Sequence, residues 1–211
     1  MQKIVVVDYG MGNLRSVAKA LEFVAREHSL AVNVVVSSSP GQVADADRVV
    51  FPGQGAMPDC MRYLGESGLE EAVRRAAASK PFLGICVGMQ MLFDRSEEGE
   101  TPGLGLFGGT VARFRPVDPA QKVPHMGWNT IAQTRPHQLW QDIPNDERFY
   151  FVHSYFCEPT DHTATVATTE YAGSFTAAIA HDNIFATQFH PEKSHRAGLT
   201  FYKNFLCWTP A

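Results

Sequence analysis

The chain has 211 residues, a formal net charge of −4, and a composition that is 45% hydrophobic and 19% charged. These values suit one large α/β domain over residues 1–211, and the mild charge offers no footprint for nucleic acid or an anionic membrane. The four cysteines lie far apart without a CxxC pair, so we expect no metal site, no cofactor and a reducing, cytoplasmic location. The apolar run that Asp8 ends is too short for a signal peptide, and no stretch is long enough to span a membrane.

The first half of the chain alternates between strand-like and helical patterns. Residues 4–7 form a continuous β-branched run, which is typical of a strand buried on both faces. From Leu14 onward the apolar residues recur with a helical period, which predicts a helix that Asn13 can cap. This alternation continues to residue 94 and predicts βαβ units with a mostly parallel sheet. Further strands are expected at residues 32–36, 49–51 and 82–85, and further helices at 57–64, 69–78 and 87–94.

Strand-like runs dominate the second half, after a glycine-rich loop expected at residues 99–109. Tight polar turns such as 181–183 indicate hairpins, and a last helix is expected at 196–208. The predicted fold class is therefore α/β, with a central, mostly parallel sheet flanked by helices and antiparallel strands added in the C-terminal half. These later strands are expected at residues 110–114, 127–132, 148–156, 163–169, 176–180 and 184–188.

Cys86 stands between a buried strand and a helix, with Gly84 and Gly88 two residues to either side. This is the glycine–nucleophile–glycine spacing of a nucleophile elbow, with cysteine in place of serine. The turn is tight, so a side chain at either glycine would push the helix away from the strand. The alternative is a structural cysteine buried at a strand–helix junction.

A second glycine-rich turn, Pro52-Gly53-Gln54-Gly55, follows the strand expected at residues 49–51. Taken alone it is a plain turn. Beside an elbow cysteine it becomes a source of backbone amides, because acyl transfer needs a second donor for its oxyanion and a neighbouring strand's loop usually provides it.

Among eight histidines, His190 has the most informative context, because it follows a strand and heads the segment His190-Pro191-Glu192. Pro191 biases the segment toward extended geometry, in which residues two apart share a side. A carboxylate at Glu192 could then hold the imidazole in one tautomer and stabilise the imidazolium. A surface turn is the alternative, but with Cys86 in the same chain we favour a Cys86–His190–Glu192 triad.

The segments GICVGMQ at residues 84–90 and FHPE at residues 189–192 resemble the class I, triad-type glutamine amidotransferases. The resemblance runs from the first strand to the last helix and is closest to members that supply a (β/α)8-barrel cyclase in histidine biosynthesis. The segments that carry this closer match are DYGMGN at residues 8–13, KVPHMGWN at 122–129, FVHSY at 151–155 and HPEKS at 190–194.

The resemblance implies a glutaminase that hydrolyses L-glutamine through a glutamyl thioester on Cys86 and passes ammonia through a channel to the cyclase subunit of a heterodimer. It assigns the oxyanion hole to the Gly53–Gln54 region and the Val87 amide. It gives the holding of glutamine to Gln90, His153, Ser154 and Tyr155. It places five residues at the cyclase interface: Asn13, His125, Met126, Trp128 and Lys193.

Three rival functions stay open at this point. One is a class I amidotransferase subunit that serves another synthase, and its co-purifying partner would distinguish it. Another is a stand-alone cysteine hydrolase, which would reach its full rate without a partner. The last is a non-catalytic interaction subunit, against which the complete triad speaks.

Overall fold

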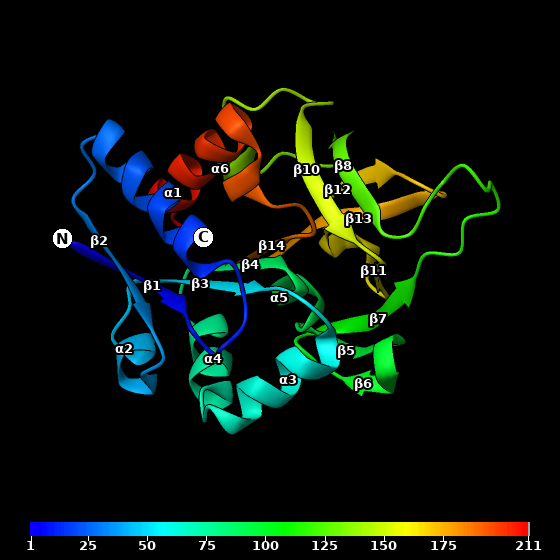
Figure 1. Cartoon of the computed structure of the whole chain (residues 1–211). Coiled ribbons are helices and arrows are strands. Elements are labelled where there is room, and N and C mark those ends of the chain that lie inside the picture. The colour runs from blue at the N-terminus through cyan, green and yellow to red at the C-terminus, as the bar shows by residue number, and fades with distance from the viewer. Residues whose placement is uncertain (211) are drawn as a thin grey trace.

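A twelve-stranded sheet crosses the molecule in the computed structural model, which describes residues 1–210 (Figure 1). The helices α1 and α6 lie on one side of this sheet, and α2, α3 and α4 lie on the other (Figure 1). The helices are α1 (Leu14–Glu27), α2 (Pro40–Ala44), α3 (Met57–Glu66), α4 (Glu70–Ala77), α5 (Val87–Gln90) and α6 (His195–Cys207). Four 3-10 turns complete them, namely η1 (Glu98–Glu100), η2 (Gln138–Trp140), η3 (His162–Ala164) and η4 (Pro191–Lys193).

Five parallel strands in the order β2-β1-β3-β4-β14 form one half of the sheet. Their continuous apolar runs fit this position, since helices cover both faces and every residue of β3 and β4 is buried. These strands are β1 (Gln2–Val7), β2 (Val32–Ser37), β3 (Arg48–Gly53), β4 (Phe82–Cys86) and β14 (Ile184–Thr187). The carboxyl ends of β3 and β4, where the glycine-rich turn and Cys86 follow, therefore meet at one edge.

Antiparallel strands extend the sheet from β14 through β13, β11 and β7, as the sequence predicts. The strands of this half are β5 (Phe93–Ser96), β6 (Thr101–Pro102), β7 (Phe107–Arg113), β9 (Ala132–Gln133), β11 (Tyr155–Pro159), β12 (Thr165–Glu170) and β13 (Ser174–His181). One of their pairings, that of β5 with β7, is parallel. A separate antiparallel pair, β8 (His125–Thr130) and β10 (Arg148–His153), stands beside them (Figure 1). None of the helices within residues 1–210 has the length and apolar character that a membrane span requires.

The helix expected at residues 87–94 is wrong beyond its first turn, because α5 ends at Gln90 and the chain continues as β5. The returning segment before β7 causes this change. The amides of Leu104, Gly105 and Leu106 donate to the carbonyls of Met91, Phe93 and Leu92, which an extended chain presents and a helix would use itself. Because of the same pairing, the strand expected at residues 110–114 begins earlier, at Phe107, within the segment expected to be a loop.

Two further expectations are corrected by tertiary contacts. The single strand expected at residues 148–156 is two strands in different sheets, broken at Ser154, with β10 on β8 and β11 on β7. Asn13 precedes α1 without capping it, because its side-chain amide donates to Glu192 Oε1 instead. The short helix α2, which the sequence analysis missed, begins after Ser39, whose hydroxyl accepts from the Gln42 amide.

Candidate active site

Cys86 lies at the junction of β4 and α5 with a φ of 55° and a ψ of −114°. A positive φ is uncommon for a residue with a side chain and costs about 1–3 kcal/mol, which the surrounding packing must offset. That packing depends on glycines, since a Cβ at Gly88 would lie 2.0 Å from the Phe51 carbonyl oxygen. A Cβ at Gly53 would lie 2.6 Å from the Gly88 nitrogen. The elbow predicted around Cys86 is therefore present, with β3 pressed directly against α5.

We expect Gly88→Ala to lower the free energy of unfolding by about 3 kcal/mol, because the added methyl group must separate β3 from α5. Thermal and urea unfolding of the purified variant measure this change. Gly65→Ala is the matched control, because a Cβ at Gly65 meets nothing within 4 Å. Since Gly65 lies within α3, that variant should be slightly more stable than the wild type. Equal stability of the Gly88 variant and the wild type would contradict the close packing of the elbow.

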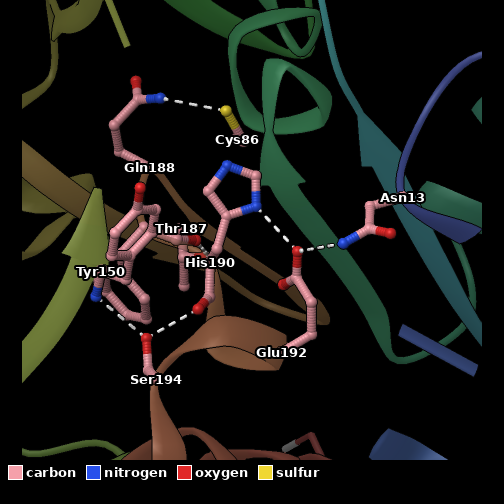
Figure 2. Close-up of polar contacts among 9 residues, drawn as sticks. Asn13, Cys86, Tyr150, Thr187, Gln188, His190, Glu192 and Ser194 are labelled. Atoms are coloured by element: carbon pink, nitrogen blue, oxygen red, sulfur yellow. Dashed lines mark hydrogen bonds and ion pairs between the residues drawn. The ribbon is translucent and has the colours of Figure 1, made fainter. Parts of the chain in front are cut away.

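His190 and Glu192 meet as a hydrogen-bonded pair, with 2.8 Å between Nδ1 and Oε1. Figure 2 shows the His190 ring between Cys86 and Glu192. Both side chains are nearly inaccessible, with 5% and 1% exposure. The sequence-based reason for the pairing is wrong in one respect, because residues 191–193 form the turn η4 rather than an extended segment. The turn is held by Ser194, whose hydroxyl donates to the His190 carbonyl and accepts from the Tyr150 amide.

The electrostatic surroundings of His190 favour its charged form. Burial lowers the pKa of His190, but the negative charges that Cys86 and Glu192 can carry outweigh it and raise that pKa to about 10. A charged imidazole in this position could act as an acid beside a cysteine nucleophile.

Glu192 has a second, less satisfied oxygen. Its Oε1 also accepts from Asn13 Nδ2 at 3.5 Å, whereas the buried Oε2 has no hydrogen-bond partner within the described residues. The buried Tyr202 hydroxyl is likewise without a partner among residues 1–210, and burial together with the Glu192 carboxylate raises the pKa of this tyrosine well above its usual value.

A cavity of about 340 Å³ opens over Cys86 and His190. It gathers residues from six separate parts of the chain, including most of those that the sequence assigned to the oxyanion hole and to glutamine. The lining consists of Gln54, Gly55, Cys86, Val87, Gln90, Glu98, Pro124, Val152, His153, Ser154, Tyr155, His190 and Lys193. A larger groove of about 1010 Å³ along α6 is lined by none of Cys86, His190 and Glu192.

Glu98 is a charged lining residue that the sequence analysis missed. It lies in η1 and is the only carboxylate among the described residues of the lining. Its Oε2 accepts from the Met57 amide at 2.8 Å, which fixes the side chain. Only the acidic run at residues 97–100 marks it in the sequence, and such a run is usually a solvated surface.

The oxyanion candidates lie at the meeting point of two strands. Gly53 is directly opposite Cys86 in the parallel pairing of β3 and β4. Gln54 and Val87 both line the cavity. The Gln54 carbonyl accepts from the Cys60 thiol at 3.3 Å, which ties down the turn after β3.

The five residues assigned to the partner interface do not share one environment. Met126 and Trp128 are 63% and 41% exposed on β8, and Lys193 is also exposed. Asn13 is half-buried against Glu192. His125 is buried in this chain.

The comparisons with known proteins agree with this geometry. The family model of class-I glutamine amidotransferases matches residues 5–207. Two full-length relatives are the imidazole glycerol phosphate synthase subunits HisH of Aromatoleum aromaticum, 56% identical, and of Nitrosospira multiformis, 58% identical. In both cases the alignment covers 100% of this chain and 100% of the relative.

Solved structures show the same fold at low identity. A putative GMP synthase protein from Thermoplasma acidophilum superimposes with a TM-score of 0.70 at 21% identity, over 98% of this chain and 93% of that one. The chain therefore belongs to the class-I glutamine amidotransferases and, within them, to the HisH subunits of imidazole glycerol phosphate synthase.

Proposed function

We propose that the chain hydrolyses L-glutamine at Cys86 and hands the ammonia to a (β/α)8-barrel cyclase subunit in a heterodimer. The observation that carries this proposal is the convergence on one cavity of Cys86 and His190, whose ring is paired with the buried Glu192 carboxylate. The relatives' shared name, a synthase subunit, supports a partner chain.

In the proposed reaction, Cys86 Sγ attacks the side-chain amide carbon of glutamine. Amides of Val87 and of the Gly53–Gln54 turn hold the developing oxyanion, where one donor typically contributes about 3 kcal/mol. The imidazolium of His190 protonates the departing nitrogen, so that ammonia leaves and a glutamyl thioester remains. His190, now neutral, removes a proton from water, which attacks the thioester and releases glutamate with the Cys86 thiolate. Glu192 holds His190 in one tautomer throughout.

The cavity offers groups for the amino-acid end of glutamine as well. The Glu98 carboxylate is suited to bind the α-ammonium group of glutamine, and Gln90 with the strand-end residues 153–155 is suited to bind the rest of the ligand.

We expect Glu98→Gln to raise the KM for glutamine about tenfold or more, since a charge-assisted hydrogen bond contributes about 1.5–3 kcal/mol. Steady-state glutamate release measures it. Glu97→Gln is the control, because Glu97 points to Arg113 and Arg115 outside the cavity. An unchanged KM for glutamine would show that the Glu98 carboxylate does not bind the substrate.

Transfer to a partner follows from the chemistry of ammonia. At neutral pH free ammonia is mostly protonated and no longer a nucleophile, so a closed path between subunits preserves its reactivity. The exposed side chains of Met126 and Trp128, together with Lys193, provide an apolar and basic surface for the cyclase near the cavity.

We also propose that residues 1–211 act as one domain in a reducing cytoplasm. One continuous core that reaches from Ile4 to Trp208 and the unpaired state of all four thiols support this.

The test is glutamate release from glutamine by the purified chain, alone and with the barrel cyclase carrying its nucleotide ligand. A large increase with the loaded cyclase would support the proposal. Equal rates in both conditions would indicate an independent hydrolase. No release in either condition would overturn glutamine hydrolysis by this site.

A further inference from the structure

Two buried histidines stand side by side beneath the β8–β10 pair. His125 and His153 are directly opposite each other in the antiparallel register, and only 4% and 6% of their surfaces are exposed. The distance from His125 Nδ1 to His153 Nε2 is 2.9 Å, so one ring donates to the other. The reaction described above does not use His125.

Backbone carbonyls terminate this hydrogen-bonded chain at both ends. His153 Nδ1 lies 2.8 Å from the Tyr155 carbonyl oxygen, which can only accept. At the other end, Asn129 Nδ2 donates to the Glu170 carbonyl at 3.0 Å and lies 3.3 Å from His125 Nε2. Asn129 cannot turn its amide over, because its Oδ1 accepts from the Thr130 amide.

These end points fix every proton between them. His153 must carry its proton on Nδ1 to serve Tyr155, so its Nε2 accepts from the Nδ1–H of His125, whose Nε2 accepts from Asn129. An additional proton on either ring would place two donors against each other somewhere in the chain. Burial also favours two neutral rings, since it lowers the pKa of His125 to about 4 and that of His153 to about 3.

The Tyr155 carbonyl links this chain to the active site. It also accepts from Gln90 Nε2 at 3.0 Å, and the same nitrogen donates to Gln188 Oε1 at 3.0 Å. Gln188 in turn directs its amide nitrogen at Cys86 Sγ, 3.7 Å away (Figure 2). The orientation of Gln90 in the cavity therefore depends on where the histidine pair holds Tyr155.

We propose that His125 is a positioning residue for the glutamine site. Asn129, His125 and His153 form an uncharged chain of hydrogen bonds, the relay, in which each side chain donates to the next group. This relay holds the Tyr155 carbonyl, and with it the Gln90 amide, in the position that binds the substrate. This inference rests on the proposed function. The relay also shares β8 with the exposed Met126 and Trp128, so a partner seated on that strand and the cavity are joined by the same backbone.

The first test is the protonation state of the wild-type chain, which does not depend on glutamine turnover. Nitrogen-15 imidazole spectra should show His125 and His153 as neutral rings with the proton on Nδ1, unchanged from pH 7 to pH 5.5. The charged or titratable side chains around the pair are His190, whose positive charge disfavours a charged His153, and Tyr171, whose ring stacks on His125 with 4.1 Å between the ring centroids. A proton on Nε2 of either ring, or titration of either ring near its usual pKa, would overturn the relay.

The second test separates positioning from packing by kinetics in the complex with the loaded cyclase. His125→Phe keeps a flat ring against Tyr171 but leaves His153 Nε2 without a donor. It should raise the KM for glutamine about tenfold and change kcat by less than threefold. His125→Asn, whose amide can replace Nδ1, should restore much of the lost affinity. His137→Phe is the matched control, because burial lowers the pKa of His137 to about 4 as well and it lies outside the cavity.

If His125→Phe does not fold, Asn129→Ala interrupts the relay from its half-buried far end and should raise KM about threefold. A wild-type KM in these variants, or equal effects of the Phe and Asn substitutions, would overturn the proposal. Under either of these two outcomes the wild type would still hydrolyse glutamine. Failure of the proposed function would instead appear as no hydrolysis by the wild type, with the imidazole spectra unaffected.

Discussion

Cys86→Ala should lower glutamine-dependent glutamate release at least ~10⁴-fold, because no other described residue of the cavity lining carries a thiol and removing a nucleophile typically costs this much or more. In the heterodimer the same variant should form the cyclase product from added ammonium salt at a rate within about twofold of the wild type. The two rates separate the two half-reactions, since ammonia supplied from solution does not require the thiol. Coupled assays of glutamate and of cyclase product measure both.

The matched control is Cys207→Ala, which removes an exposed thiol at the end of α6 and should leave both rates unchanged. A Cys86→Ala variant that retained glutamine-dependent synthesis would revive the hypothesis that this chain is a non-catalytic partner. Loss of the ammonia-dependent rate as well would mean that the substitution disturbs the complex rather than the chemistry. Circular dichroism and co-elution with the cyclase identify that case.

The elbow could be predicted from sequence because its signal, a cysteine with glycines two residues to either side, lies within one short segment. Cys86 has a positive φ, and α5 packs directly against β3, so there is no room for side chains at Gly53 and Gly88. Glycines at these positions therefore indicate the turn in the sequence. The β-branched run of β1 is equally local, since burial on both faces requires continuous apolar residues. The same kind of reasoning failed after Gln90, where distant backbone donors, rather than helical propensity, determine the structure.

The histidine relay and Glu98 could not be predicted, because each depends on a long-range register. His125 meets His153 only because β8 pairs with β10 in one register, and a shift by one residue would turn His125 outward. Glu98 enters the cavity because the Met57 amide, 41 positions away in sequence, holds its carboxylate. His190 and Glu192 lie between these cases, since their spacing is local but a turn rather than an extended strand brings them together.

Glu192→Gln should lower kcat about 10²-fold or more while the KM for glutamine stays within about threefold, because Glu192 contacts His190 and does not line the cavity. The physical reason is the loss of a negative charge 2.8 Å from Nδ1. That charge favours the imidazolium, so its removal must lower the pKa of His190 below the value of about 10 that burial and the two anions together set. The carbon-13 or nitrogen-15 signals of the His190 ring report this directly. In the wild type the ring should stay charged up to about pH 9, and in the variant it should lose its proton at lower pH.

Glu22→Gln removes an exposed carboxylate from α1 and should alter neither kcat nor the His190 signals. The pH profile of kcat distinguishes a lost charge from a misplaced ring. If the variant only lowers the His190 pKa, its activity should fall most steeply on the alkaline side, where the weaker imidazolium no longer protonates the leaving nitrogen. If Glu192 mainly orients the ring, the loss should be uniform with pH. An unchanged kcat together with an unchanged His190 pKa would show that the carboxylate is not part of the proton-transfer machinery.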